Sequence, residues 1–330
     1  MANDIGRAMA RLSHRDIRTR RRAVRTLFEH DDPSTLEAFE VLLDDEDPWF
    51  VSKALDAYRQ WAPLTGPDDV GTLLKHANLD VRRAGSNLLS SLGQEGRSLA
   101  KRALEDEDGV VQKKAAQALL RVAENEDLST LANHASPTIR GLAVQHPSLP
   151  PSILMSALDD DAEPVRKHAL NAVLERELDI SVDVLEPFFL ADMQAVPILI
   201  WASKHHPERL PMFTSKMKTT HIKALSDHLR AHVISSQDPL LQSLLEANVL
   251  EPVARWVLRQ GSDEDDLRWS LINNDDLAVI ERSKLLERLI GRAGEQDVQQ
   301  RVLSFIKTND NELLKVACEN LSTAASELEP

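Results

Sequence analysis

The chain has 330 residues, more than one hydrophobic core usually holds, so we expect several domains or one array of repeats. Leu, Ala and Val dominate the 42% of apolar residues, aromatic residues reach only 4%, and there is one tyrosine, which favours helices over a β-rich fold. The formal net charge of −14 argues against general affinity for nucleic acid, and the lone cysteine, Cys318, excludes an intrachain disulfide and a cysteine-based zinc site.

The sequence shows no signal for membrane insertion or secretion. No stretch approaches 18 apolar residues, so no transmembrane helix is expected and no membrane partner is predicted. Residues 1–16 contain no apolar segment of the kind that a signal peptide requires. We therefore expect a cytoplasmic protein.

Residues 1–30 depart from the acidic background of the chain. They hold eight arginines and three acidic residues, so this segment carries a formal charge of +5 and the rest carries −19. Eight arginines exceed what one repeat needs, and we expect some of them to form a basic surface for an acidic partner. The residues assigned to this surface are Arg18, Arg21, Arg22 and Arg25. Alternatively, several of them pair with acidic residues of the next repeat.

One block recurs six times along residues 12–175. Each copy begins with a leucine, followed seven residues later by a bulky residue and four residues after that by a small one. Two copies depart from this pattern, with Ala132 in place of the leucine and Thr19 in place of the bulky residue. The copies are Leu12/Thr19/Ala23, Leu43/Phe50/Ala54, Leu74/Val81/Gly85, Leu104/Val111/Ala115, Ala132/Ile139/Ala143 and Leu158/Val165/Ala169. This regular spacing predicts pairs of helices that must stack, because neither helix of a pair can bury its apolar face alone.

A residue that can cap a helix stands three positions before the bulky residue in five copies. Such side chains accept a hydrogen bond from a free amide at the helix start. The predicted caps are Asp16, Asp47, Asn78, Asp108 and Ser136. The sixth copy departs from this pattern with Ala162. The preceding helices have start signals of their own, namely the capping-box spacing of Ser34 and Glu37 and the prolines Pro67 and Pro150.

The block resembles the short form of the HEAT repeat family known from phycobilisome-lyase-type repeats. The resemblance lies in the pattern L-x-D-x-(D/E)-x-x-V-R-x-x-A-x-x-A-L, which is clearest in LDDDAEPVRKHALNAVL (158–174) and LEDEDGVVQKKAAQALL (104–120). The segment IRGLAVQHPSLPPSILMSAL (139–158) is also similar to the leucine-rich-repeat-variant family. The resemblance implies an all-α fold, a right-handed α-solenoid of stacked antiparallel helix pairs that forms a HEAT-like superhelix.

Arginine directly follows the bulky residue in four positions: Arg20, Arg82, Arg140 and Arg166. These residues could form a ladder that contacts phosphates. The other interpretation is an internal ladder, in which each guanidinium pairs with the aspartate of an adjacent turn.

The turns before the bulky residues alternate in character. Copies two, four and six carry the acidic runs 44–47, 105–108 and 159–161, whereas copies one, three and five carry His14, His76 and His134. We interpret these turns as solvated edges that contain caps, and a docking edge for a basic partner is the alternative.

The remaining chain is less regular. After the regular repeats of residues 1–175, residues 176–260 keep helical periodicity without the signature, so we expect irregular helical repeats of the same solenoid there. C-terminal helical repeats are predicted in residues 261–321, and a frayed tail in residues 322–330. A last copy fits at Ile306/Leu313/Ala317/Leu321, with Asp310 as its cap.

Between residues 204 and 232, positive charge replaces the acidic background. Three histidines there are seven and four residues apart, which places them on one face of a continuous helix. We expect an exposed basic, histidine-lined face for an anionic partner; buried histidines or a metal site are the alternatives. The residues assigned to this face are Lys204, Arg209, Lys216, Lys218, His221, Lys223, His228, Arg230 and His232.

The sequence contains no constellation typical of a catalytic site. No histidine is followed by glutamate, which excludes the di-iron dyads of the HEAT-like deoxyhypusine hydroxylases. HEAT-like alkylpurine DNA glycosylases use tryptophans in a basic cleft, and Trp256 does lie beside Arg255 and Arg259, but the body of the chain is acidic. We therefore predict no catalytic residues, no metal site and no cofactor.

The predicted function is that of a non-catalytic scaffold that binds a protein partner along the solenoid groove. The alternative is a nucleic-acid-associated protein, for DNA or RNA binding or repair, that uses the N-terminal arginines and the 204–230 patch. The net charge disfavours this alternative.

Overall fold

The structure is a computed structural model that describes residues 2–328, with side chains described for residues 4–326. Every regular element in this range is a helix and no strand occurs in it, so the predicted all-α class is confirmed. The chain divides into unit 1, Met1–Val173, and unit 2, Leu174–Pro330. The finer predicted boundaries at residues 175, 260 and 321 stay predictions.

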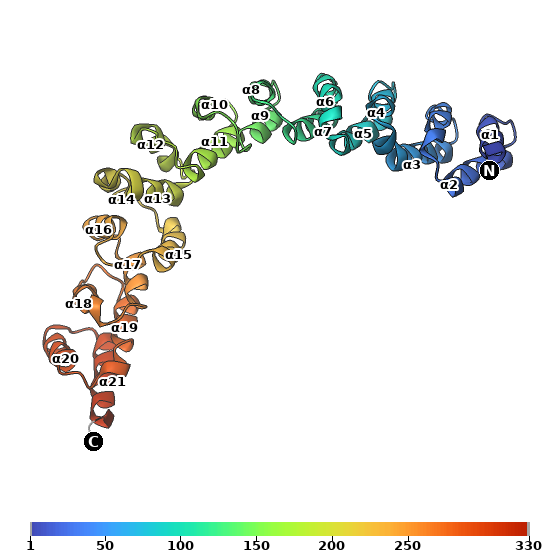
Figure 1. Ribbon diagram of the computed structural model, residues 1–330. Helices are drawn as coiled ribbons and strands as arrows, with labels where there is room; N and C mark the ends of the chain where they lie inside the picture. Colours follow the sequence, from blue (N-terminus) through green and yellow to red (C-terminus); the bar gives the residue numbers. More distant parts are fainter. Residues whose placement is uncertain (1, 329–330) are drawn as a thin grey trace. The chain divides into compact units, whose positions relative to one another are not determined.

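Unit 1 is a solenoid of antiparallel helix pairs that follow one another in two rows (Figure 1). The first row contains α1 (Ala2–Ala10), the 3-10 helix η1 (Pro33–Leu42), α4 (Pro67–Leu74), α6 (Arg97–Ala103), α8 (Asn125–Ala132) and α10 (Pro151–Ala157). The second contains α2 (Ile17–His30), α3 (Pro48–Thr65), α5 (Leu79–Leu88), α7 (Gly109–Leu120), α9 (Pro137–Ala143) and α11 (Glu163–Glu175), whose last residues open unit 2. The short 3-10 helices η2 (Leu89–Ser91) and η3 (Gly93–Gly96) connect α5 to α6.

Burial confirms the predicted register of the six copies. The bulky residues Phe50, Val81, Val111, Ile139 and Val165 are all buried, and only Thr19 of the first copy is partly exposed. The small residues Ala23, Ala54, Gly85, Ala115, Ala143 and Ala169 are buried as well. At Gly85 the helices approach so closely that a Cβ atom would lie 2.7 Å from the Cβ atom of Leu73. The small positions are therefore where the paired helices meet.

Unit 2 repeats this arrangement with more irregular elements. Its helices are α12 (Val182–Leu190), α13 (Ala195–His205), α14 (Leu210–Thr214), α15 (Ile222–His232), α16 (Pro239–Glu246), α17 (Leu250–Val257), α18 (Asp265–Ile272), α19 (Val279–Glu287), α20 (Gln296–Thr308) and α21 (Glu312–Leu328). The 3-10 helices η4 (Pro207–Arg209), η5 (Thr219–His221), η6 (Ser262–Glu264) and η7 (Ile290–Arg292) lie between them. Helices α15, α17, α19 and α21 pack in one row, and α14 and α16 pack against each other beside it.

Most helix starts follow the predicted cap chemistry. Asp16, Asp47, Asn78 and Asp108 each accept a hydrogen bond from a backbone amide in the first helical turn. Ser136 occupies the cap position of α9, but its side chain accepts no such bond. The predicted capping box at Ser34 is wrong, because η1 begins at Pro33 and Asp32 accepts the bond from the Ser34 amide.

The start of the last predicted copy is displaced by one residue, whereas Ala317 and Leu321 are buried as predicted. Helix α21 begins at Glu312, and Asn311 rather than Asp310 accepts bonds from the amides of Leu313 and Leu314. Leu314 and Cys318 are fully buried, whereas Leu313 is 45% exposed. Burial raises the pKa of the Cys318 thiol to about 11. Helix α21 continues to Leu328, beyond the predicted start of the tail at residue 322; residues 329 and 330 lie outside the described range.

Candidate functional site

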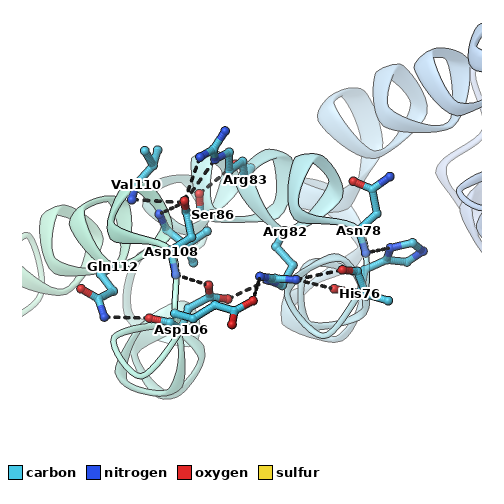
Figure 2. Close-up of polar contacts among 12 residues, drawn as sticks. His76, Asn78, Arg82, Arg83, Ser86, Asp106, Asp108, Val110 and Gln112 are labelled. Atoms are coloured by element: carbon cyan, nitrogen blue, oxygen red, sulfur yellow. Dashed lines mark hydrogen bonds and ion pairs between the residues drawn. The ribbon is translucent and has the colours of Figure 1, made fainter.

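The arginine that follows the bulky residue serves as an internal ladder in unit 1. Arg82 donates from Nε to Asp106 of the next repeat at 2.9 Å, and from a terminal nitrogen to the His76 and Ala77 carbonyls at 3.2 and 3.0 Å (Figure 2). Arg140 makes the same set of contacts with Asp160, His134 and Ala135. Arg20 pairs with Asp45, and Arg166 donates to the carbonyls of its own turn, Asp160 and Asp161. These guanidinium groups are engaged within the solenoid, so the phosphate-contacting ladder is not supported.

In the alternating turns, histidine and aspartate side chains accept the same type of hydrogen bond from the backbone. Nδ1 of His14, His76 and His134 accepts a hydrogen bond from the amide two residues later, at 3.0 to 3.1 Å. In copies two, four and six, a carboxylate oxygen of Asp45, Asp106 and Asp160 accepts the equivalent bond at 2.8 to 3.0 Å. The aspartate copies additionally receive the ladder arginine of the preceding histidine copy. The structural unit of this edge is therefore a pair of repeats, and the turns act as a stacking device.

A second rung of the ladder uses the helix caps. Arg83 donates two hydrogen bonds to Asp108, at 3.2 and 2.8 Å, while Asp108 caps α7 (Figure 2). The bond from Arg83 is the largest of the effects that lower the pKa of Asp108 to about 2. Arg21 takes the same position relative to Asp47 at 3.1 Å, and its guanidinium lies over the Trp49 ring. Arg21, which was assigned to the partner surface, thus pairs within the solenoid.

The other arginines assigned to the partner surface differ from Arg21. Arg18, Arg22 and Arg25 are exposed, and none of them forms an ion pair with the carboxylates of residues 4–326. They are spaced by four and three residues in α2, which places them on one helical face. We call these three residues the α2 basic face.

A polar cavity lies beside this face, between α1 and α2. Its volume is about 610 Å³, and it is lined by Arg7, Arg11 and Arg22 together with Asp4 and His14. Arg7 and Arg11 were counted in the basic segment but not singled out. Arg7 lies in α1 and Arg11 directly follows its last residue, so their spacing of four residues was the available signal that both reach the same side.

The basic residues of the 204–232 segment are largely paired with carboxylates that lie one repeat earlier. Lys204 contacts Glu177 at 2.6 Å, Arg209 contacts Asp183 at 2.7 Å, and Lys216 contacts Glu186 at 2.6 Å. Lys218 lies 3.5 Å from Asp192, and Arg230 pairs with Asp227 in its own helix. Lys223 is exposed. The patch is therefore partly neutralised, which the local sequence could not show.

The three histidines of this segment do not form one exposed face. His221 lies in η5 before α15 begins, is buried, and bonds to Asp192 through Nε2. That bond is the largest of the effects that lower the pKa of Asp192. His228 and His232 lie next to each other, with ring centroids 4.7 Å apart, and burial together with His232 lowers the pKa of His228. The prediction failed for His221 because this residue packs against Phe189 and Asp192 of the preceding repeat, whereas His232 is exposed.

Arg268, Asp265 and Arg292 form a largely buried charged cluster in unit 2 that the sequence analysis did not predict. Arg268 is 1% exposed, pairs with Asp265, and donates to carbonyls at the end of α17, including that of Gln260 at 2.8 Å. Asp265 also accepts two bonds from Arg292, at 3.0 and 2.7 Å. Arginine within the apolar run LRWSL was the available signal. The cluster satisfies the orphan carbonyls of a helix end and is structural.

Four of the five tryptophans lie in the protein interior rather than in an open cleft, and Trp49 is partly exposed. Trp61, Trp201, Trp256 and Trp269 are all buried. The indole of Trp256 donates to the Val233 carbonyl at 2.9 Å. The arrangement used by the HEAT-like glycosylases is thus not reproduced at Trp256.

The part of the chain that the structure describes has neither a candidate metal site nor a candidate membrane-spanning helix. No group of three or more His, Cys, Asp or Glu side chains in that part could hold a metal ion. Likewise, none of its helices combines the length and apolar character needed to cross a membrane.

No known protein family and no curated protein matches the chain. Among solved structures, it is similar to an engineered protein, with 15% identity and a TM-score of 0.32 over 98% of this chain and 99% of that chain. It is also similar to a mutant of Kap121p, with 13% identity and a TM-score of 0.39 over 99% of this chain and 40% of that one. The complex of CpcE and CpcF of phycocyanin lyase from Nostoc sp. PCC7120 matches with 16% identity and a TM-score of 0.30 over 74% and 92%. The helix stacking described above defines the protein as an α-solenoid of antiparallel helix pairs.

Proposed function

We propose that this protein is a non-catalytic scaffold of short HEAT-type repeats that binds an acidic surface of a protein partner through the α2 basic face. The observation that carries this proposal is the contrast between paired and unpaired arginines. Arg20 and Arg21 of α2 are held by Asp45 and Asp47, while Arg18, Arg22 and Arg25 of the same helix are exposed without an ion pair in residues 4–326. Cationic side chains that stacking does not use are available to a partner.

The 204–232 segment is a weaker part of the proposed surface. Its cations can contact a partner only by giving up or sharing their carboxylates, as Arg209 would with Asp183. Lys223 and His232 are exposed and remain candidates. The cytoplasmic location expected from the sequence also remains a prediction.

The nucleic-acid alternative has less support. Binding to a nucleic acid requires several uncompensated cations along the phosphate backbone. Three of the four ladder arginines of unit 1 and most cations of the 204–230 patch already have carboxylate partners. The fourth ladder arginine, Arg166, donates to backbone carbonyls. A single basic face on α2 fits a local acidic patch on a protein better.

Affinity capture with matched variants tests the proposal. The test variant replaces Arg18, Arg22 and Arg25 by Gln, and the control replaces Arg102, Arg121 and Arg259, which are also exposed. Exposed ion pairs contribute up to about 1 kcal/mol each, so we expect about a tenfold loss of partner recovery with the test variant only. Equal recovery of the same proteins by both variants would contradict the proposal. Loss of all recovered proteins after nuclease treatment would favour the nucleic-acid alternative.

A further inference from the structure

We propose that the cavity between α1 and α2 binds a phosphate monoester group. Three arginines, Arg7, Arg11 and Arg22, line this cavity of about 610 Å³. One carboxylate, that of Asp4, is also part of the wall. The lining is therefore strongly cationic within a protein whose net charge is −14.

The donors of the cavity suit a phosphoryl group. A guanidinium presents its N–H groups in a planar fork that matches two phosphate oxygens, and arginines from two helices can approach one group from different sides. His14 adds a further donor. Its Nδ1 accepts the bond from the Asp16 amide at 3.0 Å, so in the neutral ring the proton lies on Nε2.

The three arginines are not engaged by an acidic residue in the part of the chain whose side chains the structure describes. No ion pair joins Arg7, Arg11 or Arg22 to a carboxylate in residues 4–326, although the ladder residues Arg20 and Arg21 are paired in the same helix. Like charges that line one cavity repel one another, and a dianion there would offset this repulsion. Each arginine side chain is exposed, so a ligand can reach it from solvent.

A phosphate monoester fits better than a nucleic-acid backbone. A monoester carries a charge of about −1.5 to −2 near neutral pH, which matches one concentrated cluster of cations. A nucleic acid spreads single charges over many phosphates and needs a longer basic track. The monoester could be a small phosphorylated molecule or a phosphorylated side chain of a partner. In the second case the inference deepens the proposed function and rests on it.

Titration of the full-length protein with inorganic phosphate and O-phosphoserine at low salt, followed by calorimetry, tests the inference. The variants are Arg7→Gln, Arg11→Gln and Arg22→Gln, with Arg15→Gln as control, because Arg15 is exposed on the same segment but does not line the cavity. We expect saturable binding of both probes, weakened about three- to tenfold by each cavity variant and less than about twofold by the control. Circular dichroism checks that each variant is folded.

Further arms separate the sources of the phosphate and the alternatives. A phosphoserine peptide that binds more tightly than O-phosphoserine, while its unphosphorylated form does not bind, identifies a protein side chain as the source. Equal affinities identify small phosphate esters. Absence of saturable phosphate binding, an equal loss in the Arg15 variant, or stronger competition by an oligonucleotide without terminal phosphate overturns the inference. The proposed function is judged separately by partner capture, which does not depend on these titrations.

Discussion

Neighbouring repeats are joined by ion pairs in both units, but the order of the charges is opposite. In unit 1 the earlier repeat supplies the arginine and the later one the carboxylate, as in Arg82 and Asp106. In residues 177–221 the earlier repeat supplies the carboxylate, as in Asp183 and Arg209. The side chains of the first pair are 13% and 11% exposed, and those of the second 45% and 74%. The first arrangement therefore stabilises the stack more strongly per pair.

This difference explains why the signature lapses without loss of the solenoid. The V-R pattern of unit 1 serves a turn whose carbonyls are bonded by the arginine, so the residue types recur. Most pairs of residues 177–221 are exposed, such as Lys204 with Glu177, and at such positions any acid and any base at a distance of about one repeat can pair. A stretch of basic residues in a solenoid should thus be compared with the acidic residues one repeat away before it is assigned to a partner.

The largest expected effect lies in the buried cluster of unit 2. Arg268→Ala leaves the Gln260 carbonyl and one side of Asp265 without a partner, and we expect a loss of about 3–5 kcal/mol in the free energy of unfolding. Chemical denaturation measures the loss, and Arg259→Ala is the control because Arg259 is exposed. Similar effects of the two substitutions would show that the cluster does not stabilise unit 2.

The close approach of helices in unit 1 gives the next effect. Ala115 and Ala169 are fully buried, so Ala115→Leu or Ala169→Leu should overpack the contact and lower the free energy of unfolding by about 1–3 kcal/mol. Lys113 is exposed on the same helix as Ala115, and Lys113→Leu should have almost no effect. Equal losses at positions 113 and 115 would contradict the register.

Acidification tests the ladder itself. The bond from Arg140 is the largest of the effects that lower the pKa of Asp160 from 3.8 to about 2. A lowered folded-state pKa adds stability that is present above pH 4 and is lost as the pH falls toward 2, worth about 1–2 kcal/mol for this residue. We expect denaturation curves at pH 5 and pH 2.5 to differ less for Arg140→Gln than for the unchanged protein. An identical pH dependence of the variant and the unchanged protein would show that Arg140 does not stabilise the ionised form of Asp160.

The smallest effect is expected at the exposed pairs of unit 2. Arg209→Gln removes a contact to a carboxylate that is largely in solvent, so the free energy of unfolding should change by less than about 1 kcal/mol. Denaturation at low and at high salt measures this change, which salt should reduce further. A loss as large as that of Arg140→Gln would remove the distinction between the two regions.

The repeat register could be predicted because burial imposes it at fixed spacing. The small residues Ala54 and Ala143 recur where helices meet, and both are fully buried. The start of the final copy was displaced because Asp310 and Asn311 are both good caps and Leu313 and Leu314 are both apolar, so the local pattern fits two helix starts equally well. In the structure Leu314 is the buried residue of the two.

The charged contacts were harder to predict than the core. Whether Arg21 faces Asp47 or solvent depends on which repeat lies beside it, and the sequence alone left both interpretations open. The cavity at Arg7 and Arg11 likewise requires the positions of two helices. Spacing identifies the face of a helix, but the structure is needed to show what covers that face.

Paired arginines hold the stack of unit 1, and we propose that the α2 basic face binds the partner. The most direct test measures melting temperature and partner capture for Arg82→Gln and for the variant with Arg18, Arg22 and Arg25 replaced by Gln. We predict that Arg82→Gln lowers the melting temperature by about 2–6 °C with capture retained, whereas the triple variant loses capture with its melting temperature unchanged. A triple variant that melts early but still captures the partner would contradict the account.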